Sequence, residues 1–207
     1  IWYRNDLRVL DHSGLAVAAE SGEPVVALFI RTEKQWSEQL MAERKKNLIY
    51  GQLEDLSASL AKLDIPLIVD TAPSYTRSVA VLMKYCNSLP VKQVHMCEEY
   101  ELNEVKRDAM AAEKLGAKGI SLRRYHDSLI FPPGSICKQD GSPYGVFTPF
   151  KRRWLAELKQ TMPPCAKKIR PIAANKKLAP LPDAIENKVS TPKYKHDPYW
   201  TTNEKSA

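Results

Sequence analysis

Short apolar segments alternate regularly with helical patterns over the first 125 residues, and this alternation limits most strongly what the chain can fold into. The apolar segments are rich in Val, Ile and Leu and mostly apolar on both faces, as in buried parallel strands; we place them at residues 1–4, 25–30, 66–69, 93–97 and 120–125. The helical patterns between them cover residues 13–21, 42–63, 75–88 and 101–115. The sequence therefore predicts an α/β fold, namely a Rossmann-like, doubly wound, five-stranded parallel sheet with helices on both faces.

The pattern changes after Tyr125, where a long irregular segment runs to Thr148. A helix is then predicted for residues 150–160, with Pro149 in its first turn. Residues 163–207 contain seven prolines interleaved with Lys and show no apolar period. We therefore expect an α/β domain over residues 1–162, followed by a Pro- and Lys-rich linker or arm over residues 163–207.

The positive charge of the chain lies in its last quarter. The net charge is +7, and residues 151–207 alone carry 13 Lys and Arg against 5 Asp and Glu. Basic segments attract phosphate backbones through counterion release, and the cluster Lys151, Arg152 and Arg153 is one candidate for contact with DNA. A solvated linker or solvent-facing cluster is the alternative interpretation.

Several function classes receive no support from the residues. The four cysteines form no Cys-x-x-Cys pair, and the four histidines have no metal-ligand spacing. We therefore assign no metal site and no catalytic residue, and expect reduced thiols in a cytoplasmic protein. No apolar stretch approaches the roughly 20 residues of a membrane span. No Gly-rich phosphate loop follows the first strand, so the fold class alone does not indicate a dehydrogenase.

The first predicted strand ends in alternating charges, Arg4, Asp6 and Arg8, before the first predicted helix. Asp11 or Ser13 is the expected N-cap of that helix, because a short side-chain oxygen can accept the free amide hydrogens of the first turn. Carboxyl ends of strands bind ligands in doubly wound sheets, so these charges can hold a ligand or a partner domain. We favour the alternative, in which Asp6 pairs with one of the two arginines and fixes the loop.

A second polar group, Asn103 and Glu104, follows the fourth predicted strand at the start of a helix. Asn103 offers a donor and an acceptor, and Glu104 can accept two parallel N–H bonds. This pairing suits the edge of a pterin or similar heterocycle, which presents an amino group beside a ring N–H. Composition alone favours the alternative, a charged first helical turn, because Glu favours helix starts.

Three segments in order along the chain resemble the photolyase/cryptochrome family. They are Trp-Tyr-Arg-x-Asp-Leu-Arg at residues 2–8, Tyr-Glu-x-Asn-Glu at residues 100–104, and the stretch from Asp127 to Phe-Thr-Pro-Phe at residues 147–150. Together they look like the amino-terminal antenna domain of a bacterial, folate-using cyclobutane-pyrimidine-dimer DNA photolyase. The resemblance covers residues 1 to about 160.

This resemblance implies a light-driven DNA repair lyase. Asn103 and Glu104 would bind the pterin of a methenyltetrahydrofolate antenna, and FAD would bind to a second, helical domain that these residues do not contain. The implied partners are that helical domain of the same protein and UV-damaged DNA, without a membrane partner, in a monomer. The domain alone would be inactive in repair, so none of its residues is assigned as catalytic.

One position departs from the folate-using pattern, because Gln39 stands where such relatives often have His. A Gln can still hydrogen-bond a pterin, although its stacking and charge differ. Two rival functions remain open from the sequence: a cryptochrome, which is a photosensory protein without repair activity, and a stand-alone α/β nucleotide-binding module.

Overall fold

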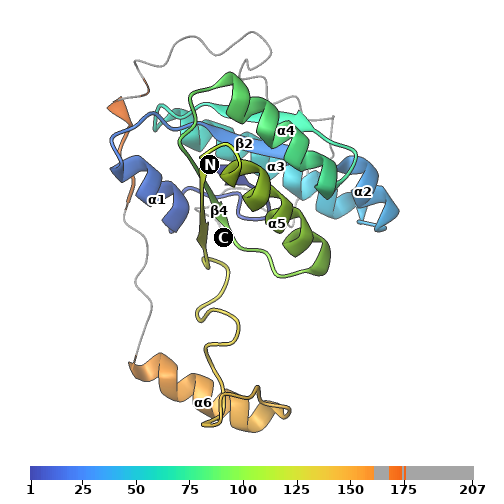
Figure 1. Cartoon of the computed structure of the whole chain (residues 1–207), viewed down its shortest axis with the longest axis vertical. Helices are drawn as coiled ribbons and strands as arrows, with labels where there is room; N and C mark the ends of the chain where they lie inside the picture. Colours follow the sequence, from blue (N-terminus) through green and yellow to red (C-terminus); the bar gives the residue numbers. More distant parts are fainter. Residues whose placement is uncertain (161–167, 174, 176–207) are drawn as a thin grey trace.

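Helices and parallel strands alternate along the chain in the computed structural model, which describes residues 1–160, 168–173 and 175 (Figure 1). The elements in order are β1 (Trp2–Tyr3), α1 (Ser13–Glu20), β2 (Ala27–Arg31), α2 (Glu33–Glu38), α3 (Glu43–Ala61), β3 (Leu67–Thr71), α4 (Tyr75–Ser88), β4 (Gln93–Cys97), α5 (Leu102–Gly116), β5 (Ser121–Tyr125) and α6 (Phe147–Gln160). All five predicted strands exist and all five predicted helices exist, and α4 and β4 have the predicted bounds. The prediction of an α/β fold is confirmed.

The strands form two sheets where the sequence predicted one. β1, β2 and β3 make one parallel sheet, and β4 pairs with β5 in a second. β1 pairs with β2 over only two residues, Trp2 with Leu28 and Tyr3 with Phe29. No backbone ladder joins β1 to β4 among the described residues; instead the guanidinium of Arg4, directly after β1, donates to the carbonyl of Cys97 in β4. The prediction of a single five-stranded sheet is therefore wrong, because a side chain bonds β4 where a ladder was expected.

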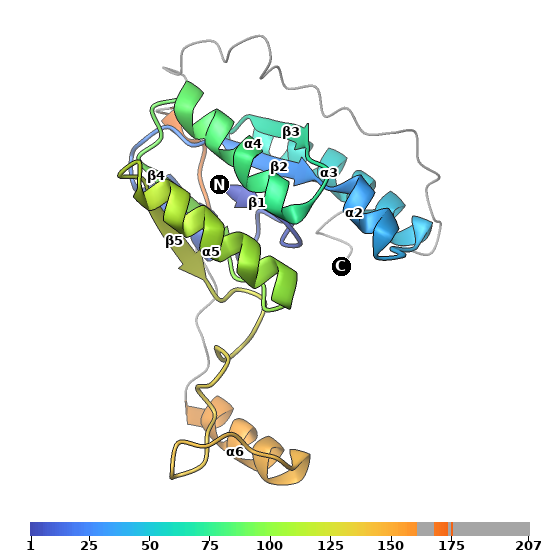
Figure 2. The same cartoon turned by 45° about the vertical axis from the view of Figure 1, so that its right-hand side comes forward.

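Helices cover both faces of the strands, as predicted for a doubly wound fold. Consecutive strand residues point to opposite faces, so Tyr3 joins the core under α1 and α3, whereas Trp2 joins the core under α4 and α5. Figure 2 shows α4 and α5 in front of the strands and α3 behind them. Leu53 and Leu60 of α3 are fully buried, and burial of such a side chain stabilises a fold by about 1.5–3 kcal/mol.

Local differences from the predicted elements have local causes. The sequence did not predict α2, which is six residues long and buries only Trp36, too little for a periodic signal. β5 is mostly exposed rather than apolar on both faces, because it is an edge strand. Arg123 and Arg124 lie on its surface.

The N-cap of α1 is His12, not Asp11 or Ser13, so that prediction is wrong. The ring Nδ1 of His12 accepts the amide hydrogen of Leu15 at 3.1 Å. Asp11 has a left-handed backbone with φ of 46°, which is not the extended conformation of an N-cap residue. The amide of Ser13 instead donates to the carboxylate of Asp127, at 2.6 Å. Asp127 follows β5 and is therefore distant from Ser13 in the sequence.

The described residues that follow α6, 168–173 and 175, contact the α/β core. Ile172 is buried in the cluster beneath α3, and Asn175 bonds both the amide and the carbonyl of Val25. Most of residues 163–207, for which little regular structure is expected, lies outside the described residues. None of the described helices has the length and apolar character needed to cross a bilayer.

The helix α6 lies apart from the sheets in both views (Figure 1, Figure 2). It begins three residues earlier than predicted, and Pro149 is in its first turn as expected. The rings of Phe131 and Tyr144, from the irregular segment before it, contact Trp154 and Phe150 edge-on. None of its residues is buried.

Candidate functional site

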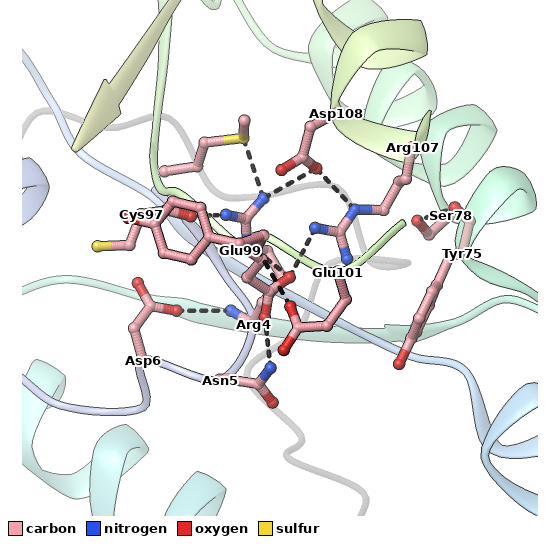
Figure 3. Close-up of polar contacts among 12 residues, drawn as sticks. Arg4, Asn5, Asp6, Tyr75, Ser78, Cys97, Glu99, Glu101, Arg107 and Asp108 are labelled. Carbon is pink, nitrogen blue, oxygen red and sulfur yellow. Dashed lines mark hydrogen bonds and ion pairs between the residues drawn. The ribbon is translucent and has the colours of Figure 1, made fainter. Parts of the chain in front are cut away.

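A buried network of charges joins the carboxyl ends of β1 and β4 to the first turns of α5 (Figure 3). Arg4, which follows β1, donates to the sulfur of Met96 at 3.0 Å and to the carbonyl of Cys97, and its NH1 lies 3.3 Å from Oδ1 of Asp108. The side chains of Arg4 and Asp108 are both less than a tenth exposed. A buried cation is tolerated only with such partners, because its desolvation is costly.

Arg107 completes this network from α5. Its Nε donates to Oδ1 of Asp108 at 2.8 Å, and its NH2 donates to Oε2 of Glu99 at 2.7 Å. Glu99 also accepts a hydrogen bond from the side chain of Asn5. Burial alone would lower the pKa of Arg107, but the charges of Asp108 and Glu99 raise it. Two cations therefore balance two anions, and the network attaches α5 to the end of β1.

Aromatic rings extend the network toward the surface. The guanidiniums of Arg4 and Arg107 lie 5.0 and 5.1 Å from the ring centre of Trp2, and that of Arg107 also lies 5.4 Å from the ring of Tyr75. Cations at such distances are attracted to the ring face. The four side chains form a continuous column from the buried β1 strand to Tyr75, the half-buried first residue of α4.

The predicted ligand residues Asn103 and Glu104 lie in the first turn of α5, directly above this network. Asn103 is exposed and Glu104 is half-buried. Residues four apart share a helix face, so Glu104 lies above Asp108, and Asn103 lies above Arg107. Both predicted residues therefore project from a helical turn that buried ion pairs hold in place. Their role in binding a ligand stays a prediction.

Tyr75 is a neighbour of Glu104 that sequence reasoning missed. Burial, together with the carboxylates of Glu104 and Glu99, raises the pKa of Tyr75 to about 12 against the opposing charge of Arg107. Its amide donates to Oε1 of Gln35 at 2.5 Å. The available signal was positional, since Tyr75 opens a helix just after β3 and thus stands at the same carboxyl edge as the other strand ends.

Other residues near this edge are open to solvent. Gln39, the C-cap of α2, is exposed. Leu102 is 69% exposed and Val105 is 47% exposed, and these two apolar side chains flank Asn103 and Glu104 in sequence. A polar pair between exposed apolar side chains is the composition expected of a surface that a ligand or partner covers.

The charged turn after β1 fixes its own loop, as favoured from the sequence, but with different partners. Asp6 Oδ1 accepts the backbone amide of Arg4 at 2.8 Å, and Oδ2 lies 2.9 Å from Nε2 of His12. Arg8 donates to the carbonyls of Asp11 and Asp127. The expected side-chain pairing of Asp6 with an arginine is therefore wrong, because His12 occupies that place. Burial would raise the pKa of Asp6, but the hydrogen bond from His12 and the charge of Arg4 hold it well below its usual range.

The structure brings Asp6, His12 and Cys97 together in a buried cluster with the spacing of possible metal ligands. No pattern in the sequence predicts this cluster, because His12 and Cys97 are 85 residues apart. Nδ1 of His12 accepts a hydrogen bond from the amide of Leu15, so Nε2 carries the ring proton and donates a hydrogen bond to Asp6. Burial, together with the charges of Asp6 and Asp127, raises the pKa of the Cys97 thiol. A protonated thiol and a fully bonded imidazole are poor metal ligands, so we interpret the cluster as structural.

The remaining candidates are His126 and the cationic cluster of α6. Nδ1 of His126 lies 2.9 Å from the hydroxyl oxygen of Tyr100, and the two rings stack, so we interpret His126 as structural. Lys151, Arg152 and Arg153 are exposed on α6, where Arg153 pairs with Glu157 at 3.0 Å. Contact of this cluster with DNA stays a prediction.

Comparisons with known proteins cover most of the chain. The family model "DNA photolyase" matches residues 1–170. The chain is 34% identical to the deoxyribodipyrimidine photo-lyase of Vibrio cholerae serotype O1, over 95% of this chain and 40% of that protein. It is 36% identical to the protein of the same name from Escherichia coli K12, over 82% of this chain and 36% of that one. The chain thus spans about two fifths of the length of these curated relatives.

Solved structures give the same result for the fold. A bacterial class III photolyase from Agrobacterium tumefaciens matches with a TM-score of 0.64 at 25% identity, over 88% of this chain and 38% of that one. A cryptochrome from Synechocystis sp. PCC6803 matches with a TM-score of 0.70 at 23% identity, over 82% of this chain and 36% of that one, which supports the fold alone.

Proposed function

The chain belongs to the DNA photolyase family, as an amino-terminal photolyase α/β domain, and on that premise we propose that it carries the antenna pigment of a light-driven DNA repair enzyme. The proposed reaction of the whole protein is that of a deoxyribodipyrimidine photo-lyase, the name of its relatives from Vibrio cholerae and Escherichia coli. The proposed partners are a helical FAD-binding domain of the same protein and UV-damaged DNA. The proposed pigment is of the methenyltetrahydrofolate type, bound by Asn103 and Glu104.

One observation carries this proposal: a half-buried carboxylate and an exposed amide project from a helical turn that buried ion pairs hold in place. The carboxylate of Glu104 can accept two parallel N–H bonds, and Asn103 can both donate and accept. A pterin edge presents an amino group beside a ring N–H, so the donor set of the site fits it. When bound, such a pigment would supply absorption of near-ultraviolet or blue light and transfer of that excitation to reduced FAD, whose electron splits the pyrimidine dimer.

The chain's own residues do the binding and orienting in this proposal. Arg107 and Asp108 tie the first turns of α5 to Glu99 and Arg4, so the position of Glu104 is set before a ligand arrives. A preformed site loses less conformational entropy on binding than a mobile one. The exposed Leu102 and Val105 provide an apolar border that a covering helical domain would bury.

A cryptochrome is the second candidate function. The chain is 30% identical to Cryptochrome-1 of Arabidopsis thaliana, over 75% of this chain and 22% of that protein, and the α/β fold is shared with the Synechocystis cryptochrome. Photorepair of a dimer-containing oligonucleotide by the full-length protein separates the two functions, since a cryptochrome binds flavin without repairing DNA.

The proposal is tested by an absorption and fluorescence titration of the 207-residue chain with methenyltetrahydrofolate. We expect saturable binding that the double variant Asn103→Ala/Glu104→Ala loses. The matched control is Asn87→Ala/Glu113→Ala, which removes an exposed amide and an exposed carboxylate outside the first turn of α5. Equal binding by wild type and the Asn103/Glu104 variant would contradict the assignment of these residues.

The same assignment makes a prediction for the full-length protein. Glu104→Ala should lower its content of bound pigment while repair driven by direct excitation of the flavin stays intact, because Glu104 lies in the antenna domain. Pterin absorbance in the purified variant equal to that of wild type would refute this prediction.

A further inference from the structure

Tyr75 stands at the candidate site without a role in the proposed function. It is the first residue of α4, it is half-buried, and it lies beside Glu104 at the carboxyl edge of the strands. We propose, in an inference that rests on the proposed function, that the ring of Tyr75 forms one wall of the pigment site. The flat heterocycle stacks on this ring while Asn103 and Glu104 bind the edge of the heterocycle. The class of ligand selected is therefore a planar, conjugated heterocycle with an amino group beside a ring N–H.

The position of the ring is set from three elements. The amide of Tyr75 donates to Gln35 in α2, and its carbonyl accepts the hydroxyl of Ser78 at 2.5 Å within α4. The guanidinium of Arg107 in α5 lies 5.4 Å from the ring centre. Figure 3 shows Tyr75 and Arg107 approaching each other from neighbouring helices. The backbone of Tyr75 is thus fixed by contacts in α2 and α4, and its ring contacts α5 at the point where the predicted ligand residues project.

The partner of Tyr75 is itself immobile. Arg107 is 4% exposed, and it is bonded to Glu99 at 2.7 Å and to Asp108 at 2.8 Å. It also lies against Trp2 at the buried end of the same column. Because the guanidinium is fixed by two ion pairs and two rings, the aromatic ring resting on it has a defined orientation. A ring oriented in advance stacks on a ligand at little entropic cost.

The chemistry of the neighbourhood matches an edge-and-face mode of recognition. The ring of Tyr75 lies 5.4 Å from the guanidinium of Arg107, which is one helical turn from Asn103 in α5, and the carboxylate of Glu104 acts on the Tyr75 hydroxyl. The edge-binding residues and the aromatic ring are therefore adjacent. Aromatic side chains pair with other flat rings in offset stacks, and a ring wall beside hydrogen-bonding groups is the usual composition of a heterocycle pocket. A saturated or non-planar ligand would lose the face contact.

Two variants of Tyr75 separate stacking from mere support of the fold. Tyr75→Phe keeps the ring, whereas Tyr75→Leu keeps an apolar side chain without a ring. In titrations of the 207-residue chain with methenyltetrahydrofolate, we expect Tyr75→Phe to bind within about twofold of wild type and Tyr75→Leu to bind about tenfold more weakly, the loss of one stacking contact. The decrease in absorption intensity that stacking causes in the bound pigment should persist in Tyr75→Phe and disappear in Tyr75→Leu.

The matched control is Tyr144→Leu, which removes a half-buried ring from the segment before α6 and should leave binding unchanged. Wild-type affinity and an unchanged pigment band in Tyr75→Leu would overturn the stacking role and leave the proposed function intact. Should wild type itself bind no pigment, the proposed function and this inference fall together. Loss of binding in Tyr75→Leu, with full binding in the Asn103/Glu104 variant, would support stacking on Tyr75 and refute hydrogen bonding of the pigment by Asn103 and Glu104.

If Tyr75→Leu does not fold, a measurement on the wild-type chain still tests the stacking role of Tyr75. Nuclear Overhauser contacts between the ring protons of Tyr75 and the bound pigment are expected from stacking. Their absence in a saturated complex overturns the inference.

Discussion

The buried ion pairs beneath the first turn of α5 make a quantitative prediction for Asp108→Asn. Asp108 is 4% exposed; its Oδ1 accepts from Arg107 at 2.8 Å and lies 3.3 Å from the guanidinium of Arg4. The substitution keeps the shape of the side chain and one acceptor oxygen but removes the charge. Two buried guanidiniums would then share the single carboxylate of Glu99, and one buried positive charge would be uncompensated.

The cost follows from that uncompensated charge. Breaking a buried pair by removing one partner costs about 3–5 kcal/mol, and we expect about 3 kcal/mol because Asn retains an acceptor for one hydrogen bond. The pair of Lys92 and Glu23 offers the opposite limit, since its atoms lie 2.8 Å apart while the two side chains are 74% and 59% exposed. Removing that pair should cost less than about 1 kcal/mol.

Urea unfolding of the 207-residue chain at neutral pH measures both values. With a slope of about 2 kcal/mol per molar urea, the expected loss for Asp108→Asn lowers the midpoint by about 1.5 M. Lys92→Ala serves as the exposed control and should lower it by less than about 0.5 M. If Asp108→Asn lowers the urea midpoint by no more than Lys92→Ala does, while the slope of unfolding free energy against urea concentration is unchanged, the idea that this network holds α5 in place is refuted.

Two further predictions concern the loop after β1 and the end of the described chain. The hydrogen bond from His12 depresses the pKa of Asp6 in the folded state despite burial. The stabilisation from ionised Asp6 is therefore fully present above the unfolded pKa of about 3.9 and is lost as pH falls from there through the folded pKa. Asp6→Asn should flatten the acid side of the curve of unfolding free energy against pH, and an unaltered curve would contradict this prediction. Asn175→Ala removes hydrogen bonds to the backbone of Val25 and Asp64 and should cost about 2 kcal/mol in urea unfolding, whereas no loss would show that this contact does not stabilise the chain.

Elements with a complete local signal were predicted with their bounds. α4 begins after Ser74, whose side chain caps the helix by accepting from the amide of Arg77, and its apolar residues Val79 and Leu82 fall on one buried face. Capping and periodicity act between residues within a few positions of each other, so the sequence displays both directly. The match of β4 has the same origin, because its apolar run is bounded on both sides by polar residues.

The start of α1 depends on a contact that the local sequence does not show. Its cap depends on His12, and the next amide is bonded by Asp127, which arrives from the end of β5. A short polar residue at the usual position was the reasonable expectation, but the adjacent Asp11 adopts a left-handed backbone. The carboxylate of Asp127, which bonds the amide of Ser13, lies more than a hundred positions away in the sequence. Which of the three polar residues caps α1 therefore depends on a tertiary contact.

The sequence by itself determined the order of strands and helices, the two-faced cover of the parallel strands and the placement of Asn103 and Glu104 at a strand end, because each depends on periodicity and on residues close in the chain. Only the tertiary structure decided that β1 and β4 meet through the side chain of Arg4 rather than a ladder, and that Tyr75 and Arg107 lie beside Glu104. Those contacts depend on which strand ends become neighbours, and burial then forces each charge to find a partner among the groups that the fold brings within reach.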